Sequence, residues 1–474
     1  MGALMVQGCS SSAGKSVLTA GLARVLARRG VDVVPFKAQN MSNNARVADG
    51  GEIGSAQFVQ AIAARAFPTT DMNPVLVKVN HRGSDVIVNG RFEPEISEVS
   101  WVDRTPFVSV AVFAALDRLI ATHDVVLLEG AGSPAEINLW GCDLANMAAA
   151  DAADAVVLLV VDIDRGGAFA HLFGTWALMP EPWRERIKGF ILNKFRGDET
   201  LIEPACKAIT DMTGIPFLGV VPWVDHGIPD EDNASLNGAA SGGGDLQVDI
   251  VRYPTVSNSD EFQLLAEVAN VRWVTSPEEI TTPDLIILPG SKDVFGDLAW
   301  LTANRIGRRV VELVGSGTRV VGVCGGLQIL GTRLSRESQT VEHVMGLGLL
   351  PLETVYGPDK DVRSVSVTLN TDPFGAFSEL AGITFEGYEI HVGETRRDKQ
   401  GPVRVCLDGN LGFEHGLALS VYVHGMFENP QVLGALTGRT DVRSLSQCLD
   451  DLADTLEETL AIDTVLSLIG EVHD

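Results

Sequence analysis

The cysteine at position 324 has the surroundings of a reactive nucleophile. An apolar run over residues 319–323 ends at Cys324, two glycines follow, and an apolar helical pattern begins after them. A strand, a sharp turn and a helix in this order hold a side chain clear of its neighbours, and the positive end of the helix favours a thiolate. Such a cysteine can attack an acyl carbon. The alternative is a buried structural cysteine at a strand end.

A histidine further along the chain is the candidate base for this cysteine. His424 stands near the end of an alternating strand pattern, and we predict that it forms a catalytic pair with Cys324. Gly290 ends another apolar run, so its N–H and that of Gly325 are predicted to form an oxyanion hole. Gln328, one turn into the helix, is placed to contact the substrate. A structural histidine is the alternative for His424.

The first strand pattern of the chain leads into a candidate phosphate-binding loop. The loop lies between an apolar run at 3–7 and a helical pattern, which is the context that a phosphate-binding loop requires. Its predicted ATP-binding residues are Gly8, Ser12, Gly14, Lys15 and Ser16. Backbone N–H groups would surround the phosphates of ATP, Lys15 would add positive charge, and the Ser16 hydroxyl would bind Mg²⁺. Five residues separate the two glycines, one more than in the common pattern.

Several polar residues stand where strand patterns end, on the side of a parallel sheet that binds ligands. Glu129 follows the run 124–128 and is predicted to hold the metal together with Ser16 and Asp49. Asp49 lies in a Gly-Gly turn, and Glu52 of the same turn is a further candidate to complete the shell. Asp162 and Asp164 are alternatives to Asp49. Asn193 follows the run 187–192 and is predicted to contribute to ATP binding, where an amide suits recognition of a base edge. A capping or solvated acid is the alternative for the carboxylates.

A polar cluster follows the second strand pattern. Its side chains suit a substrate that carries carboxylates and amides, and they are Lys37, Gln39, Asn40, Asn43 and Asn44. Lys37 is the predicted partner for a carboxylate or an acyl phosphate. An Asn-rich loop held by its own side-chain turns is the alternative.

The order of the patterns predicts the fold class and a division into domains. Short apolar runs alternate with helical segments, which is typical of an α/β fold with doubly wound parallel sheets. The stretch 234–245 is rich in Gly, Ala and Ser and is predicted to be a linker between an ATP-dependent domain at 1–233 and a second domain at 246–474. Within the second, residues 362–423 read as β-rich and 430–470 as helical.

Composition restricts the partners and the compartment. The chain has 474 residues and a formal charge of −26, which argues against binding to nucleic acids or to anionic membranes. The six cysteines are scattered without a C-x-x-C pair, so neither a disulfide framework nor a zinc site is predicted. No leader or membrane-spanning run is recognised, and a cytoplasmic location is predicted. Assembly into a homo-oligomer is compatible with the sequence and is left open.

The two halves of the chain each resemble a known protein family. The second half resembles the class I glutamine amidotransferases, which are flavodoxin-like, and the longer phosphate loop resembles that of dethiobiotin synthetase and its relatives. In many class I enzymes a Glu two places after the histidine orients it, whereas here that position is Met426. This points to a branch with a Cys–His pair and leaves the partner of His424 open.

Nearly the whole chain resembles the cobyric acid synthase family. The resemblance is carried by the motifs at residues 35–44, 49–54, 71–76, 132–139, 162–167 and 387–391. It implies a corrinoid substrate, with ATP, Mg²⁺ and glutamine, and amidation of adenosylcobyrinic acid a,c-diamide at its b, d, e and g carboxylates. Residues 139–142 are less polar than is usual in the family.

Three other functions compete with this interpretation. The a,c-diamide synthases act on the same macrocycle and also join an ATP-binding domain to a glutaminase domain. The sequence at residues 37–44 favours the cobyric acid synthases. A partition-type ATPase with a decayed glutaminase domain conflicts with the presence of both Cys324 and His424. A ligase for a lipid-linked cell-wall acid usually divides the two functions between two chains. The order of the amidations and the route of ammonia stay open.

Overall fold

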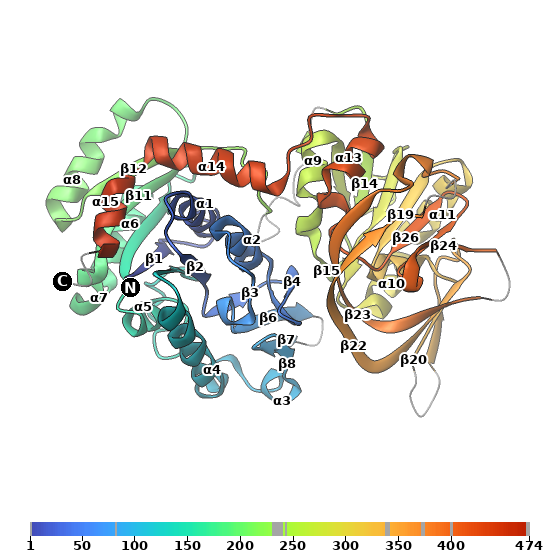
Figure 1. The fold of residues 1–474 in the computed structure, drawn as a ribbon, viewed down its shortest axis with the longest axis horizontal. Helices are drawn as coiled ribbons and strands as arrows, with labels where there is room; N and C mark the ends of the chain where they lie inside the picture. Colours follow the sequence, from blue (N-terminus) through green and yellow to red (C-terminus); the bar gives the residue numbers. More distant parts are fainter. Residues whose placement is uncertain are drawn as a thin grey trace.

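The computed structural model describes residues 2–80, 83–229, 240–241, 244–336, 342–370, 375–398 and 402–470. Two large sheets organise it, and they form two lobes that lie side by side (Figure 1). We call residues 2–229 the first unit and residues 244–437 the second unit. Most of the predicted linker, namely 234–239 and 242–243, lies outside the described residues.

The first unit is built on a parallel sheet of six strands in the order β12-β11-β10-β1-β9-β2. Helices cover both of its faces, because successive side chains of each strand point to opposite sides. On β1, Leu4 and Val6 pack in one core with α1, while Ala3 and Met5 pack in another with α4. The doubly wound α/β fold predicted from the sequence is confirmed. The bounds are β1 Gly2–Gly8, β2 Val33–Phe36, β9 Val125–Glu129, β10 Val156–Asp162, β11 Ile187–Phe195, β12 Phe217–Pro222, α1 Lys15–Arg28 and α4 Trp101–Thr122.

A smaller layer of the first unit faces the second unit. It contains a sheet with the order β3-β6-β7-β8 and the hairpin β4–β5, which leads directly into α2. Contacts between this layer and the hairpin β22–β23 join the two units. The bounds are β3 Gln39–Met41, β4 Ala45–Ala48, β5 Gly51–Gly54, α2 Ser55–Ala64, β6 Val75–Asn80, β7 Gly83–Val88 and β8 Arg91–Phe92.

The second unit has an eight-stranded sheet in the order β13-β16-β14-β17-β19-β26-β25-β24. Its five strands from β16 to β26 are parallel and its outer strands are antiparallel. A separate four-stranded sheet, β21-β20-β22-β23, begins before the β-rich region predicted at 362–423. The bounds of these strands are β13 Ala240–Ser241, β14 Gln247–Val251, β16 Asn270–Val274, β17 Leu285–Leu288, β19 Arg319–Val323, β20 Arg333–Arg336, β21 Glu342–Met345, β22 Leu352–Thr368, β23 Thr384–Arg397, β24 Arg404–Leu407, β25 Gly412–His415 and β26 Ala418–Val421.

The last two helices return to the first unit, whereas the predicted second domain included them in its range 246–474. Figure 1 shows α14 (Leu445–Thr459, red) running beside α1, with α15 (Ile462–Gly470) further along the same lobe. Leu452 and Leu456 lie against Gly21 of α1, and Arg24 of α1 is bonded to Asp450 at 2.8 Å. An amphipathic helix packs against any complementary apolar face, so its periodicity does not identify which sheet it joins.

Among the described residues, one helix is long and apolar enough to cross a membrane by length and composition alone. This helix is α4, and 28% of its apolar window is buried. Val108, Val112 and Leu116 of α4 lie in the core beside the six-stranded sheet, with the spacing of one helical face.

Candidate active sites

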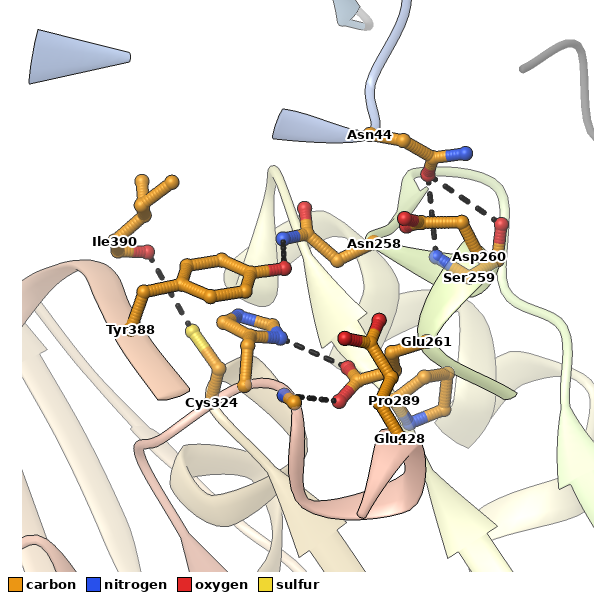
Figure 2. A network of polar contacts seen from close by, with 12 residues as sticks. Asn44, Asn258, Ser259, Asp260, Glu261, Pro289, Cys324, Tyr388, Ile390 and Glu428 are labelled. Carbon is orange, nitrogen blue, oxygen red and sulfur yellow. Dashed lines mark hydrogen bonds and ion pairs between the residues drawn. The ribbon is translucent and has the colours of Figure 1, made fainter. Parts of the chain in front are cut away.

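Cys324 stands at a strained turn between β19 and the short helix α12 (Gly325–Leu330). Its φ of 52° and ψ of −104° lie outside the regions that L-residues usually occupy. Strain of this kind is common at functional sites, where the surrounding structure imposes it. The turn requires glycine next to it, because a Cβ at position 326 would lie 1.8 Å from the Leu288 carbonyl oxygen. The Sγ of Cys324 lies 3.6 Å from the carbonyl oxygen of Ile390 (Figure 2).

His424 follows β26, and its ring lies near enough to Cys324 for the two side chains to interact electrostatically. Its ring stacks on Tyr388, with the ring centres 5.2 Å apart and the planes inclined by 18°. The backbone N–H of His424 donates to Tyr388 and that of Tyr388 donates back, so β23 fixes the position of the histidine. The structure thus brings together the two residues that the sequence predicts as a catalytic pair.

A residue that the sequence analysis missed completes this cluster. The Nδ1 atom of His424 lies 2.8 Å from Oε1 of Glu261, and Oε2 of Glu261 accepts a hydrogen bond of 3.0 Å from the Gly425 N–H (Figure 2). Glu261 belongs to the single turn η4 (Ser259–Phe262), far upstream of the histidine. Adjacent acidic residues, Asp260 and Glu261, were the signal in the sequence, but acidic pairs are common on solvated surfaces.

The electrostatic surroundings of His424 favour its charged form. Burial alone would lower the pKa of His424, but the charges of Glu261 and Cys324 outweigh it and raise this pKa from 6.5 to about 10. A carboxylate bonded to one nitrogen of an imidazole also fixes which nitrogen faces the sulfur. The cluster can therefore hold a protonated imidazole beside a sulfur nucleophile.

The predicted oxyanion residues lie at the same place. Gly290 begins the short strand β18 (Gly290–Ser291), and a Cβ on it would lie 3.0 Å from Cε1 of His424. A Cβ on Gly325 would lie 2.8 Å from the Ser291 nitrogen. Gln328 is buried, and its amide nitrogen donates to the Val392 carbonyl at 3.0 Å. Their contact with glutamine stays a prediction.

The predicted phosphate-binding loop joins β1 to α1. The Lys15 ammonium donates to the carbonyl oxygens of Ser10 at 3.2 Å and Gly132 at 3.1 Å. Gly14 has a φ of 96°, and a Cβ on it would lie 2.0 Å from the Asn193 amide nitrogen. That nitrogen donates to the Ala13 carbonyl at 2.9 Å, so Asn193 supports the loop backbone, which differs from the base-edge contact suggested by its position.

A buried carboxylate lies next to the loop. Oε1 of Glu129 accepts hydrogen bonds from the Ser16 hydroxyl at 2.7 Å and the Lys37 ammonium at 2.9 Å, and Gln60 donates to its other oxygen. A hydroxyl and a carboxylate side by side fit an Mg²⁺ ion that also binds phosphate oxygens. Within the described residues, no three His, Cys, Asp or Glu side chains form a ready-made metal site.

The third predicted metal ligand lies elsewhere. Asp49 occupies the exposed tip of the β4–β5 hairpin, with a φ of 49°. Of the two alternatives, Asp162 is buried and its carboxylate lies 3.1 Å from the Lys194 ammonium. Asp49 is predicted as a metal ligand because it precedes a Gly-Gly turn. In the structure this turn forms the tip of a hairpin, and Asp49 faces solvent there.

A cavity of about 740 Å³ opens beside the loop. It is lined by Ser12, Gly14, Lys15 and Ser16 of the loop, by Lys37, Gln39 and Asn40 of the predicted substrate cluster, and by Trp101 and Trp223. Gly8 ends β1, where the loop begins. Asn43 is directed elsewhere, because its side-chain oxygen accepts a hydrogen bond of 2.9 Å from the Val79 N–H. The cavity is large enough for a nucleotide and part of a second substrate.

Comparison with known proteins finds a matching protein family for each of the two units. Residues 4–233 match the model of the CobQ/CobB/MinD/ParA nucleotide binding domain, and residues 247–432 match that of the CobB/CobQ-like glutamine amidotransferase domain. A cobyric acid synthase of a Polaromonas species is 45% identical, with 98% of each chain covered. One from Variovorax paradoxus is 46% identical, covering 98% of this chain and 99% of the relative. The chain belongs to the cobyric acid synthase family.

Membership of the cobyric acid synthase family confirms the class of enzyme expected from the sequence. The chain is a glutamine-hydrolysing, ATP-dependent amide ligase of cobalamin biosynthesis. The second matched region ends at residue 432, before α14, which agrees with the packing of α14 on the first unit.

Proposed function

We propose that this enzyme converts adenosylcobyrinic acid a,c-diamide into adenosylcobyric acid by amidating the b, d, e and g carboxylates. The observation that carries the proposal is the presence in one chain of two groups of residues suited to the two half-reactions. One is the Cys324–His424–Glu261 cluster, and the other is the phosphate loop with Glu129 and the adjoining cavity. The first releases ammonia from glutamine, and the second activates a carboxylate with ATP.

In the second unit, the proposed reaction begins at the sulfur of Cys324. The thiolate attacks the amide carbon of glutamine, and the N–H groups of Gly325 and Gly290 stabilise the oxyanion. His424, charged through its contact with Glu261, donates a proton to the leaving ammonia. Water then hydrolyses the thioester, and glutamate and free Cys324 are regenerated.

In the first unit, the carboxylate of the corrinoid attacks the γ-phosphate of ATP, which forms an acyl phosphate and releases ADP. Ammonia then attacks the acyl carbon, and the amide forms as inorganic phosphate leaves. Lys15 and the backbone of the loop bind the transferred phosphate, and positioning and charge neutralisation dominate such a step. Ser16 and Glu129 would hold Mg²⁺, which when bound neutralises phosphate charge. Lys37, Gln39 and Asn40 line the cavity where the corrinoid side chains would enter.

The free state of the cysteines supports a reducing cytoplasm as the proposed compartment. All six cysteines lie within the described residues and none forms a disulfide.

Mass spectrometry tests the proposed substrate. The protein is incubated with adenosylcobyrinic acid a,c-diamide, glutamine, ATP and Mg²⁺, and each exchange of a carboxyl for an amide lowers the mass by about one unit. Four successive losses that require ATP are expected. An unchanged mass, with glutaminase and ATPase activity still present, would contradict the proposed substrate. Two losses from cobyrinic acid itself would indicate an a,c-diamide synthase instead.

A further inference from the structure

A cation of the first unit lies beside the acidic turn that orients His424. Arg46, on β4, is 3% exposed, and its guanidinium is bonded to the carboxylates of Asp260 and Glu428 in the second unit. The Ser55 hydroxyl, at the start of α2, donates to the same oxygen of Asp260. A buried, doubly bonded guanidinium is a geometrically demanding contact, because its donors form a rigid planar fork.

The residues next to Arg46 hold the same turn. The Asn258 amide nitrogen donates to the Ala45 carbonyl at 2.9 Å and to the Tyr388 hydroxyl at 2.7 Å. The side-chain oxygen of Asn44 accepts a hydrogen bond of 3.2 Å from the Ser259 N–H (Figure 2). Three consecutive residues of the first unit therefore bind the segment 258–260, which leads directly into Glu261.

The turn η4 carries two adjacent carboxylates, and one binds a residue of the first unit while the other binds a residue of the second unit. Asp260 points to Arg46, while Glu261 points to His424, and the two residues are neighbours in η4. Arg46 also lies over the ring of Tyr388, 5.0 Å from its centre, and Tyr388 stacks on His424. Loss of the cation would leave Asp260 as a buried charge without its ionic partner, and a buried charge of this kind drives local rearrangement. Glu261 would move with it.

We infer that Arg46 is a positioning residue for glutamine hydrolysis, and that it acts through Asp260 by holding Glu261 against His424. The glutaminase site in the second unit is thus completed by a side chain of the ATP-binding unit. The inference rests on the proposed glutaminase role of Cys324 and His424. It adds that docking of the first unit orients the acid that His424 requires.

The test compares Arg46→Met with wild type in two assays on the same preparation. We expect kcat for glutamine hydrolysis to fall about 10- to 100-fold, as for displacement of a catalytic group by about 1 Å, with little change in KM for glutamine. Amidation with free ammonium should stay within about twofold of wild type, because the phosphate loop is untouched. Arg118→Met removes an exposed arginine paired with Asp71 and should change neither rate.

A double variant separates positioning from a general effect on folding. If Arg46 acts through Glu261, Arg46→Met combined with Glu261→Gln should hydrolyse glutamine no more slowly than Glu261→Gln alone. Losses that multiply would overturn the inference, and so would wild-type glutaminase activity in Arg46→Met. If Arg46→Met does not fold, Asp260→Asn removes the same ion pair and is expected to show the same fall in kcat. A wild-type kcat for Asp260→Asn would also overturn the inference. The proposed glutaminase role of Cys324 is tested separately, because it fails if Cys324→Ala still hydrolyses glutamine.

Discussion

Glu261 and His424 are hydrogen-bonded at 2.8 Å although 163 residues separate them in the chain. The position two residues after the histidine, where many class I amidotransferases have the orienting acid, is occupied by Met426, which is fully buried in the apolar core. The carboxylate therefore reaches the imidazole from a different element. A catalytic cluster is defined by the geometry and the roles of its members, and their order in the sequence can differ.

The two sites should be separable by mutation. Cys324→Ala removes the proposed nucleophile, so it should abolish amidation with glutamine but leave amidation with free ammonium. Lys15→Ala removes the phosphate-binding cation and should abolish amidation from both nitrogen sources while glutamine hydrolysis persists. Product formation is measured by mass spectrometry and glutamate release by a coupled assay. Glutamine use by Cys324→Ala at the wild-type rate would show that another residue is the nucleophile.

The pH dependence of glutamine hydrolysis should reveal the role of Glu261. The active form pairs a thiolate with a protonated His424, so activity is lost as pH rises through the pKa of His424, which its neighbours raise to about 10. Glu261→Gln removes the largest charge that raises this pKa, so the loss should begin at lower pH, and kcat should fall about 100-fold or more.

The control for this profile is Glu414→Gln, which removes another largely buried carboxylate of the second unit. Glu414 accepts a hydrogen bond of 2.8 Å from the Gly375 N–H, whereas the carboxylate bonded to His424 is that of Glu261. Its profile should match that of wild type. An unchanged alkaline limb in Glu261→Gln would show that the carboxylate does not control the charge of the imidazole.

The metal requirement should depend on the pair beside the phosphate loop. Ser16→Ala and Glu129→Gln are each expected to raise the Mg²⁺ concentration needed for half-maximal amidation by roughly 10- to 100-fold, the usual cost of losing one group around a metal. Glutamine hydrolysis should be unaffected in both. Asp49→Asn is the matched control, because Asp49 lies at an exposed hairpin tip. A Mg²⁺ requirement raised by Asp49→Asn would place that residue at the metal after all.

Stability should depend unequally on the members of a buried ionic cluster between the units. The Glu52 carboxylate is bonded to both Lys78 and Lys360, which come from the first and second units respectively. Glu52→Gln removes the anion that both ammonium groups bind and should lower the free energy of unfolding by about 3 kcal/mol.

Lys78→Met is the matched comparison, because Glu52 keeps its bond to Lys360 in this variant. We expect a loss of about 1 kcal/mol, since a methionine can fill the apolar space of the lysine stem. Thermal unfolding followed by calorimetry at one pH measures both variants. Equal effects of the two substitutions would show that Lys360 does not compensate for the loss of Lys78.

Much of each site could be predicted because it depends on consecutive residues. The turn at Cys324 needs a strand, glycines and a helix in direct succession, and the phosphate loop needs the same between Gly8 and Ser16. Backbone conformation over such short stretches is decided by local sterics and by glycine. For this reason the elements around Cys324 and Lys15 agree with the patterns read from the sequence.

Contacts between residues that are distant in the chain could not be predicted from local patterns. Those patterns were enough to predict the nucleophile turn, the phosphate loop, the parallel sheets and the family resemblance. Folding decided that Glu261 reaches His424, that Asp49 turns to solvent, and that α14 packs on the first unit. The physical reason is that periodicity and residue type show which face of an element is buried, whereas its partner is chosen by the shape and charge of surfaces assembled from remote parts of the chain.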